Sequence, residues 1–305
     1  MFVSFERVTK FYGPVIGVNN ISCRLGPGIT GLFGANGAGK STMLNLAAGQ
    51  LRPSSGEVRL GDAHAWSTRA KHHLGYSPDI NSFYEEMTGR EFLTTMARLY
   101  GHTAAAARQR ADEAIHQVGM SGRIDRRIGG YSHGMRQRVK LAQALVNDPA
   151  VLLLDEPLNG IDPGGRHEIS ELLLELAERG KTIVVSSHLL AEVEQLTDSI
   201  LLIGRGRIVA SGTIQEIRAL IQDRPFTIQV AAEPTRPLAA LLVETPEVLS
   251  VEIRGDVLLA RTRQPTQFLA HLGELAASGR VNVRQMQVLD AGADAVFDYL
   301  EQGVP

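Results

Sequence analysis

The chain has 305 residues, which is enough for about two domains. Its 31 lysine and arginine residues against 33 aspartate and glutamate residues give a net charge of -2, which excludes a general nucleic-acid binder, because such proteins need a basic surface. The one cysteine, Cys23, excludes a disulfide within the chain. No apolar run approaches the roughly 18 residues that span a bilayer, and the first residues do not resemble a secretory signal. We therefore expect a soluble protein of a reducing, cytoplasmic compartment.

Residues 1–221 are predicted to form one α/β domain, because short apolar runs alternate with helical patterns. The predicted strands are 3–11, 29–33, 56–61, 151–154, 182–186, 200–203 and 207–210. The predicted helices are 42–48, 139–146 and 165–179, and residues from about 80 to 146 are expected to form a mostly helical insert. Buried strands that alternate with helices are typical of a parallel sheet with helices on both faces.

Residues 222–305 are predicted to be a smaller second domain, since the composition changes near 222–225. The predicted strands are 226–230, 248–253, 257–261 and 281–288, and the predicted helices are 237–243, 266–277 and 293–300. Up to residue 288 these elements follow the βαββαβ order of a ferredoxin-like α+β domain. No obvious site lies in this part of the sequence, so we expect it to help dimerisation or regulation.

A phosphate-binding loop follows the predicted strand 29–33. Residues 34–41 read Gly-Ala-Asn-Gly-Ala-Gly-Lys-Ser and match the pattern G-x-x-x-x-G-K-[ST] between a strand and a helix. Its glycines let backbone N–H groups surround an anion, Lys40 supplies a charge to the β and γ phosphates, and the Ser41 hydroxyl can bind Mg²⁺. A glycine-rich turn that matches by chance is the alternative. The candidate nucleotide-binding residues here are Gly34, Asn36, Gly37, Ala38, Gly39, Lys40, Ser41 and Thr42.

Two carboxylates end the predicted strand 151–154. Asp155 and Glu156 follow four apolar residues, and a strand buried on both faces of a parallel sheet carries its last residues to the ligand crevice. Asp155 is expected to hold Mg²⁺ there, and Glu156 could polarise an attacking water. An exposed acidic strand end is the ordinary alternative, but the phosphate loop makes the pair a candidate site.

A third stretch carries a family resemblance. Residues 131–138 read Tyr-Ser-His-Gly-Met-Arg-Gln-Arg and resemble the Leu-Ser-Gly-Gly-Gln signature of the ATPase subunits of ATP-binding cassette (ABC) transporters. Ser132 and Gly134 are retained, whereas Tyr131, His133 and Met135 depart from the common form. Taken alone, the stretch could be an ordinary helix start capped by Ser132. The other motifs occur in the family's order over about the first 215 residues.

The resemblance implies a P-loop NTPase fold, the ABC ATPase domain with its helical subdomain, and roles for single residues. Ser132 and Gly134 would bind the γ-phosphate held by a second ATPase subunit, and Asp162 would contact that partner. Tyr12 would stack on adenine, and His188 would sense the γ-phosphate. The expected catalytic residues are Glu156, His188 and Lys40.

Asp79 stands where the family usually has glutamine. Aspartate is shorter, charged and a stronger ligand for Mg²⁺. The candidate metal ligands are Ser41, Asp155 and Asp79.

The resemblance implies an enzyme that hydrolyses ATP with Mg²⁺ and powers a separate transmembrane permease, contacted near residues 80–86. It would pair with a second copy or a similar subunit, at the cytoplasmic side of the cell membrane, without nucleic acid. The signature, Asp79 and the second domain resemble the ABC-2 type exporters.

Two alternatives to a transporter subunit stay open. One is a non-transport ABC ATPase that regulates ribosomes or DNA repair, against which the single phosphate loop and the absence of sustained heptads count. The other is a P-loop kinase or GTPase. A GTPase should carry an Asn-Lys-x-Asp motif, and the sequence has none.

Overall fold

The computed structural model of the chain describes residues 1–80, 82–219 and 225–289. The chain divides into two compact units, Met1–Ile214 and Gln215–Pro305, each described below by itself. The predicted domain boundary at 222 lies outside the described residues.

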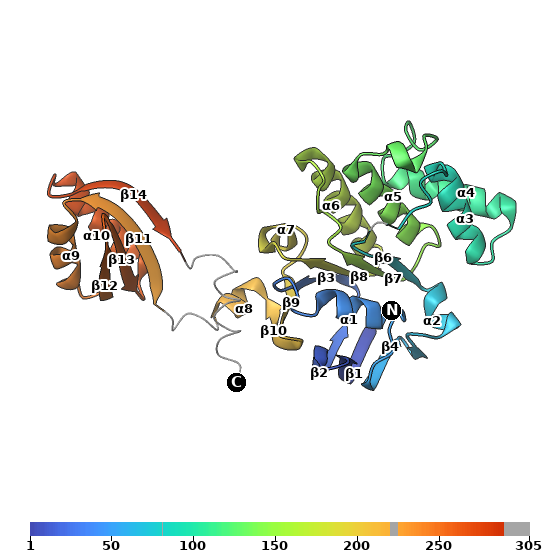
Figure 1. The fold of residues 1–305 in the computed structure, drawn as a ribbon, viewed down its shortest axis with the longest axis horizontal. Coiled ribbons are helices and arrows are strands. Elements are labelled where there is room, and N and C mark those ends of the chain that lie inside the picture. The colour runs from blue at the N-terminus through green and yellow to red at the C-terminus, as the bar shows by residue number, and fades with distance from the viewer. Residues whose placement is uncertain (81, 220–224, 290–305) are drawn as a thin grey trace. The chain divides into compact units, whose positions relative to one another are not determined.

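A six-stranded sheet forms the centre of the first unit (Figure 1). Its order is β10 (Arg207–Thr213), β9 (Ser199–Gly204), β3 (Gly28–Phe33), β8 (Thr182–Ser187), β7 (Val151–Asp155) and β6 (Leu74–Ser77). All neighbours from β9 to β6 are parallel, and β7 and β8 are buried along their whole length, as expected of a sheet covered on both faces. The expectation of a purely parallel sheet is wrong for β10, which runs antiparallel to β9 through a tight turn.

A second, antiparallel sheet corrects the prediction for the N-terminal strands. Its order is β2 (Val15–Leu25), β1 (Val3–Tyr12), β4 (Ser55–Leu60) and β5 (Ala63–His64). The strand β2 was not predicted, because its apolar residues are interrupted by polar ones on an exposed face. A two-residue turn with Gly13 at a φ of 58° joins β1 to β2, and so short a connection allows only antiparallel pairing.

Helices cover both faces of the central sheet (Figure 1). The helix α1 (Lys40–Ala47) packs between the two sheets, whereas α5 (His133–Leu145) and α6 (Pro163–Glu178) pack on the opposite face of the central one. The helices α3 (Gly89–Leu99) and α4 (Ala104–Gln117) pack against α5 and form the predicted helical insert. The shorter helices are α2 (Thr68–His72), η1 (Ile128–Gly130), α7 (Leu190–Glu194) and α8 (Ile214–Ala219).

The helix α5 begins six residues before the predicted start at 139. Ser132 caps it: its Oγ accepts a hydrogen bond from the Met135 amide at 3.3 Å. The hydrophobic core below α5 includes Leu141, Leu152 and Leu173. No helix within the described residues is long and apolar enough to cross a membrane.

The second unit holds a four-stranded antiparallel sheet in the order β12 (Val248–Arg254), β13 (Val257–Thr262), β11 (Phe226–Glu233) and β14 (Asn282–Val288). Two helices, α9 (Thr235–Val243) and α10 (Pro265–Ala277), cover one face of this sheet (Figure 1). Phe268, Leu272 and Leu238 are buried between the helices and the sheet. The predicted helix 293–300 lies outside the described residues.

Candidate nucleotide site

The phosphate loop connects β3 to α1 at the carboxyl edge of the parallel strands. Two of its glycines have left-handed backbone angles, with φ of 82° at Gly37 and 111° at Gly39. A Cβ atom at Gly39 would also lie 2.7 Å from the carbonyl oxygen of Gly17. The motif therefore needs glycine at Gly39 both for its backbone angle and for its packing against β2.

Lys40 is the first residue of α1, and it is buried. Its Nζ donates hydrogen bonds to the carbonyl oxygens of Gly34 at 2.6 Å and Ala35 at 3.3 Å, and it lies 3.7 Å from Oε1 of Glu156. Burial lowers the pKa of Lys40, and the charges of Glu156 and Asp155 oppose that shift. The ammonium group is thus held beside the loop where phosphates would bind.

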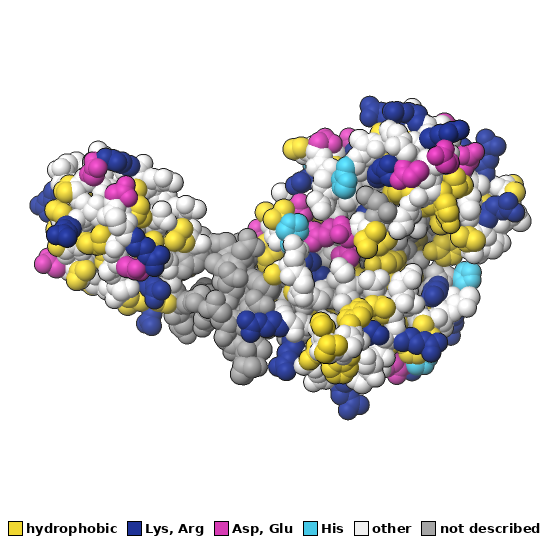
Figure 2. Space-filling view, in the orientation of Figure 1, with side chains coloured by type: hydrophobic (Ala, Val, Ile, Leu, Met, Phe, Trp, Pro, Cys, Tyr) yellow, Lys and Arg dark blue, Asp and Glu magenta, His cyan; other side chains and the backbone are white. Residues whose placement is uncertain are grey.

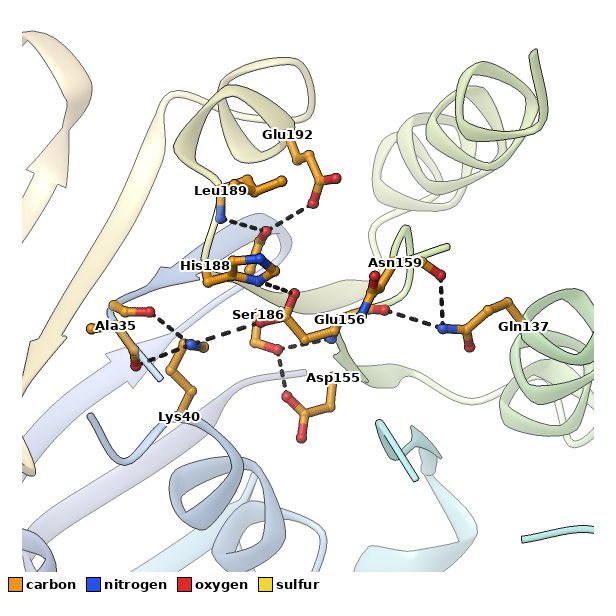
Figure 3. A network of polar contacts seen from close by, with 12 residues as sticks. Ala35, Lys40, Gln137, Asp155, Glu156, Asn159, Ser186, His188, Leu189 and Glu192 are labelled. Atoms are coloured by element: carbon orange, nitrogen blue, oxygen red, sulfur yellow. Dashed lines mark hydrogen bonds and ion pairs between the residues drawn. The ribbon is translucent and has the colours of Figure 1, made fainter. Parts of the chain in front are cut away.

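The neighbouring strand β8 holds Asp155, the last residue of β7, and the backbone of Glu156, which follows it (Figure 3). The Ser186 hydroxyl donates to Oδ1 of Asp155 at 2.6 Å and accepts from the Glu156 amide at 3.0 Å. Glu156 has a φ of 51°, an uncommon value for a residue with a side chain, and its Oε2 lies 3.0 Å from Nδ1 of His188.

Burial raises the pKa of Glu156, while the hydrogen bond from His188 and the charge of Lys40 oppose the rise. This shift brings the pKa of the carboxylate closer to neutral pH, and a general base works best when its pKa lies near the working pH.

A cavity of about 310 Å³ brings most of the predicted residues together. Beside them, Tyr12 lies at the end of β1, where its ring covers Gly17 and its hydroxyl is 3.5 Å from Oγ1 of Thr42. The predicted residues that line the cavity are Tyr12, Asn36, Gly37, Gly39, Lys40, Ser41, Thr42, Asp79 and Glu156.

The remaining residues of the phosphate loop and the acid pair lie behind the cavity wall. Gly34, Ala38 and Asp155 are buried there. His188 does not line the cavity, but it contacts Glu156, which does. The mouth of the cavity is apolar: Tyr12, Val15 and Ile16 line it and are exposed at the turn between β1 and β2. Hydrophobic side chains gather over these strands in Figure 2.

Ser132, Gly134 and Asp162 do not line this cavity. Ser132 caps α5 and is exposed, and a side chain at Gly134 would meet no atom within 4 Å. Asp162 caps α6, since its Oδ2 accepts from the Gly165 amide at 3.2 Å. The three residues therefore lie on an accessible surface and do not complete the cavity of their own chain.

Three residues that position the site were missed by the sequence analysis. Ser186 holds the Asp155 carboxylate and the Glu156 backbone amide. Gln137 donates through Nε2 to the carbonyl oxygen of Asn159 at 3.2 Å (Figure 3), and Lys140 donates to the carbonyl oxygens of Pro78 and Asp79, both at 2.8 Å. Polar residues on the buried face of a helix were the available signal for Gln137 and Lys140.

A phosphate loop that opens a helix, next to an Asp–Glu pair at the end of a parallel strand, defines a P-loop nucleotide-binding protein. Residues 18–159 match the family described as "ABC transporter". The chain is 36% identical over 250 residues to the ABC transporter ATP-binding protein YxlF of Bacillus subtilis (strain 168), and the alignment covers 82% of each protein.

Two further comparisons agree with that match. The chain is 38% identical over 288 residues to the Nod factor export ATP-binding protein I of Burkholderia pseudomallei (strain K96243), covering 93% of this chain and 92% of the relative. A solved structure described as the ATP-binding subunit of an ABC transporter superposes with a TM-score of 0.66 at 26% identity, covering 72% of this chain and 93% of that one. The chain belongs to this family: it is the ATP-binding, ATP-hydrolysing subunit of an ABC transporter.

Proposed function

We propose that the chain powers export through a separate membrane permease, and that Lys40, Glu156 and His188 carry its ATP hydrolysis. The observation behind the proposal is the single cavity that Lys40, Ser41 and Glu156 line, with His188 bonded to Glu156. The Burkholderia relative, a Nod factor export ATP-binding protein, supports export.

Within this cavity each side chain has a separate task. The Tyr12 ring stacks on the adenine at the apolar mouth, and the loop amides surround the phosphates. Lys40 offers its ammonium group to the β and γ phosphates. Glu156 orients the attacking water and accepts its proton at the carboxylate, and His188 fixes the direction of that carboxylate.

Mg²⁺ fits the donors around the cavity. In the described part of the chain, no group of three or more His, Cys, Asp and Glu side chains could hold a metal ion by itself. Mg²⁺ is ordinarily bound by one or two carboxylates, with hydroxyl, phosphate and water oxygens completing its shell. Ser41, Asp155 and Asp79 would supply the protein oxygens, and the bound ion would neutralise negative charge on the phosphates.

A second ATPase subunit would complete the site. Ser132 and Gly134 are exposed or half-buried at the start of α5, away from the cavity of their own chain. The N-terminus of a 13-residue helix offers free amides to an anion. In the proposed pair, each copy presents this helix start to the γ-phosphate held by the other, and Asp162 lies at the contact.

The permease is proposed to dock near residues 80–86. A groove of about 780 Å³ runs between α3 and the core of the first unit, and its lining includes Ile80, Met96, Leu99 and Tyr100. Ile80 is 74% exposed and Leu99 is 77% exposed. Apolar side chains this open on a surface are typical of a protein contact, which supports docking of a partner here. With a permease as that partner, the chain would work at the cytoplasmic face of the membrane.

The second unit is proposed to be a ferredoxin-like accessory domain that helps dimerisation or regulation. Support comes from its βαββαβ order and from a sheet in which the first strand, β11, lies between the third and the fourth. We expect deletion of residues 222–305 to keep ATP hydrolysis and to change the oligomeric state or the transport rate. An unchanged oligomer and unchanged transport would contradict this role.

Phosphate release by the purified full-length chain tests the proposed hydrolysis. We expect Glu156→Gln to bind a fluorescent ATP analogue normally and to lose at least about 100-fold in rate. Glu175→Gln is the matched control, because Glu175 lies on α6, where it pairs with Arg179 at the surface. A Glu156→Gln variant that hydrolyses ATP as fast as the control would contradict the proposed mechanism.

A further inference from the structure

A buried lysine that the proposed mechanism does not use lies beside the cavity. Lys140 is in the middle of α5, and only 3% of its surface is exposed. Burying an ammonium group is costly unless charges or hydrogen bonds compensate for the lost water. The described contacts of Lys140 therefore indicate what this charge does.

The ammonium of Lys140 holds the turn that follows β6. It donates to the carbonyl oxygens of two consecutive residues, Pro78 and Asp79, each at 2.8 Å. These bonds cross from α5 to the end of β6, so they fix the backbone from which the Asp79 side chain projects. Asp79 lines the nucleotide cavity together with Lys40, Ser41 and Glu156.

The charged groups around Lys140 indicate a second role for its ammonium group. Burial lowers the pKa of Lys140, and the charges of Asp79 and of the buried Asp155 oppose that shift. The charge of Asp155 also opposes the lowering of the pKa of Lys40 by burial. Two buried ammonium groups, one from α1 and one from α5, thus share the negative charge beside the cavity.

Gln137, one helical turn earlier on α5, makes the equivalent connection to the other loop of the site. Its Nε2 donates to the carbonyl oxygens of Glu156 at 3.5 Å and Asn159 at 3.2 Å. Residues three apart share one face of a helix. One face of α5 therefore binds the backbone of both loops that carry the carboxylates Asp79 and Glu156.

We propose that Lys140 is a positioning residue of the nucleotide site, which fixes the Pro78–Asp79 turn and offsets the negative charge of Asp79 and Asp155. This inference rests on the proposed function of the cavity. Lys140 touches neither the nucleotide nor the reacting atoms; it acts through the turn and through the field that a cation bound at the site would experience.

The test measures two quantities on the full-length chain: the Mg²⁺ dependence of ATP hydrolysis and the Mg²⁺ dependence of binding of the fluorescent ATP analogue. Lys140→Met removes the charge and both hydrogen bonds but keeps a long apolar side chain. We expect its maximal rate to fall about tenfold, because the turn loses its anchor, which amounts to about 1.4 kcal/mol of activation free energy. We expect its half-saturating Mg²⁺ concentration to fall about threefold, because the lost repulsion between the ammonium group and Mg²⁺ outweighs the looser hold on Asp79. Lys140→Arg keeps the charge and should restore the wild-type Mg²⁺ dependence.

Lys181→Met is the matched control. Lys181 is also largely buried, and its Nζ donates to Asp148 at 2.6 Å and to the Pro149 carbonyl at 2.7 Å, but it does not line the nucleotide cavity. Its loss should lower thermal stability and leave the Mg²⁺ dependence unchanged. If Lys140→Met does not fold, Lys140→Gln, which keeps a donor and loses the charge, should show the same fall in half-saturating Mg²⁺.

A Lys140→Met or Lys140→Gln variant with the Mg²⁺ dependence of wild type would overturn the inference and leave the proposed function intact. A wild-type chain that neither binds the fluorescent nucleotide nor releases phosphate would instead contradict the proposed function.

Discussion

Glu156 combines an uncommon backbone angle, a buried carboxylate and a histidine partner. Burial raises its pKa, and the hydrogen bond from His188 opposes this rise. A general base must be ionised, so activity is lost as the pH falls through its pKa. Because the pKa of Glu156 is raised, the loss should begin at a higher pH than for an ordinary glutamate.

The profile of kcat/KM against pH checks this expectation and the role of His188. Replacing His188 by alanine removes an interaction that lowers the pKa of Glu156. We expect the acid limb of the profile to move to higher pH, together with a lower plateau. An acid limb that stays in place or moves to lower pH would show that His188 does not act on Glu156.

His133 departs from the family signature, and it has a physical partner in the loop after β7. Its ring lies against Gly160, which has a φ of 70°, so a Cβ atom at Gly160 would collide with the ring. Gly160→Ala should therefore destabilise the fold by about 2 kcal/mol, from the left-handed backbone and from the collision.

The double variant separates these two causes. His133→Gly with Gly160→Ala removes the ring, so it should recover the part of the loss that is due to the collision. Thermal unfolding of the two single variants and the double variant measures this coupling. Strictly additive losses would mean that the ring and the loop do not interact.

At the residue scale, the sequence showed the groups that meet the nucleotide but not the groups that hold them. Lys40, Asp155 and Glu156 lie in short motifs whose chemistry depends on neighbouring positions. Ser186 and Lys140 act on residues about 30 and 60 positions away, through contacts that only the folded chain creates. No local pattern encodes such contacts.

At the scale of elements, the hydrophobic patterns predicted buried strands better than exposed ones. The strands β7 and β8 are apolar throughout and were predicted within a residue or two. The strand β2 has exposed or half-buried polar residues over much of its length, so its pattern is weak. Pairing direction was the main error, because it depends on connections: the tight turns before β2 and β10 require antiparallel neighbours.

The start of α5 tests whether Ser132 is more than a helix cap. Ser132→Ala should cost about 1 kcal/mol, because the hydrogen bond to the Met135 amide is lost. Ser132→Asp keeps a good cap and should leave stability nearly unchanged, but it places a negative charge where the partner's γ-phosphate would bind. In this variant, thermal unfolding should therefore show nearly unchanged stability, whereas ATP-dependent pairing of two copies should be weakened. Normal pairing of the Ser132→Asp variant would show that Ser132 caps α5 and does not bind the partner's γ-phosphate.

At the scale of the whole molecule, the proposed mechanism requires two ATPase subunits. The cavity holds the phosphate loop and Glu156, whereas the signature residues lie outside it on the same chain. Each proposed nucleotide site therefore needs the phosphate loop and Glu156 of one copy and the signature residues of the other. The sequence could suggest this arrangement only through its family resemblance, because a second copy leaves no periodic pattern in the chain.

Light scattering on the Glu156→Gln variant tests this central claim most directly. The substitution keeps the nucleotide-binding groups and slows hydrolysis, so ATP with Mg²⁺ should trap the paired state. We expect the mass to shift from monomer to dimer only when both are added, and the shift to disappear when Ser132→Arg is added to the same chain. A mass that ATP and Mg²⁺ leave unchanged, or a dimer that Ser132→Arg leaves intact, would contradict the shared nucleotide site.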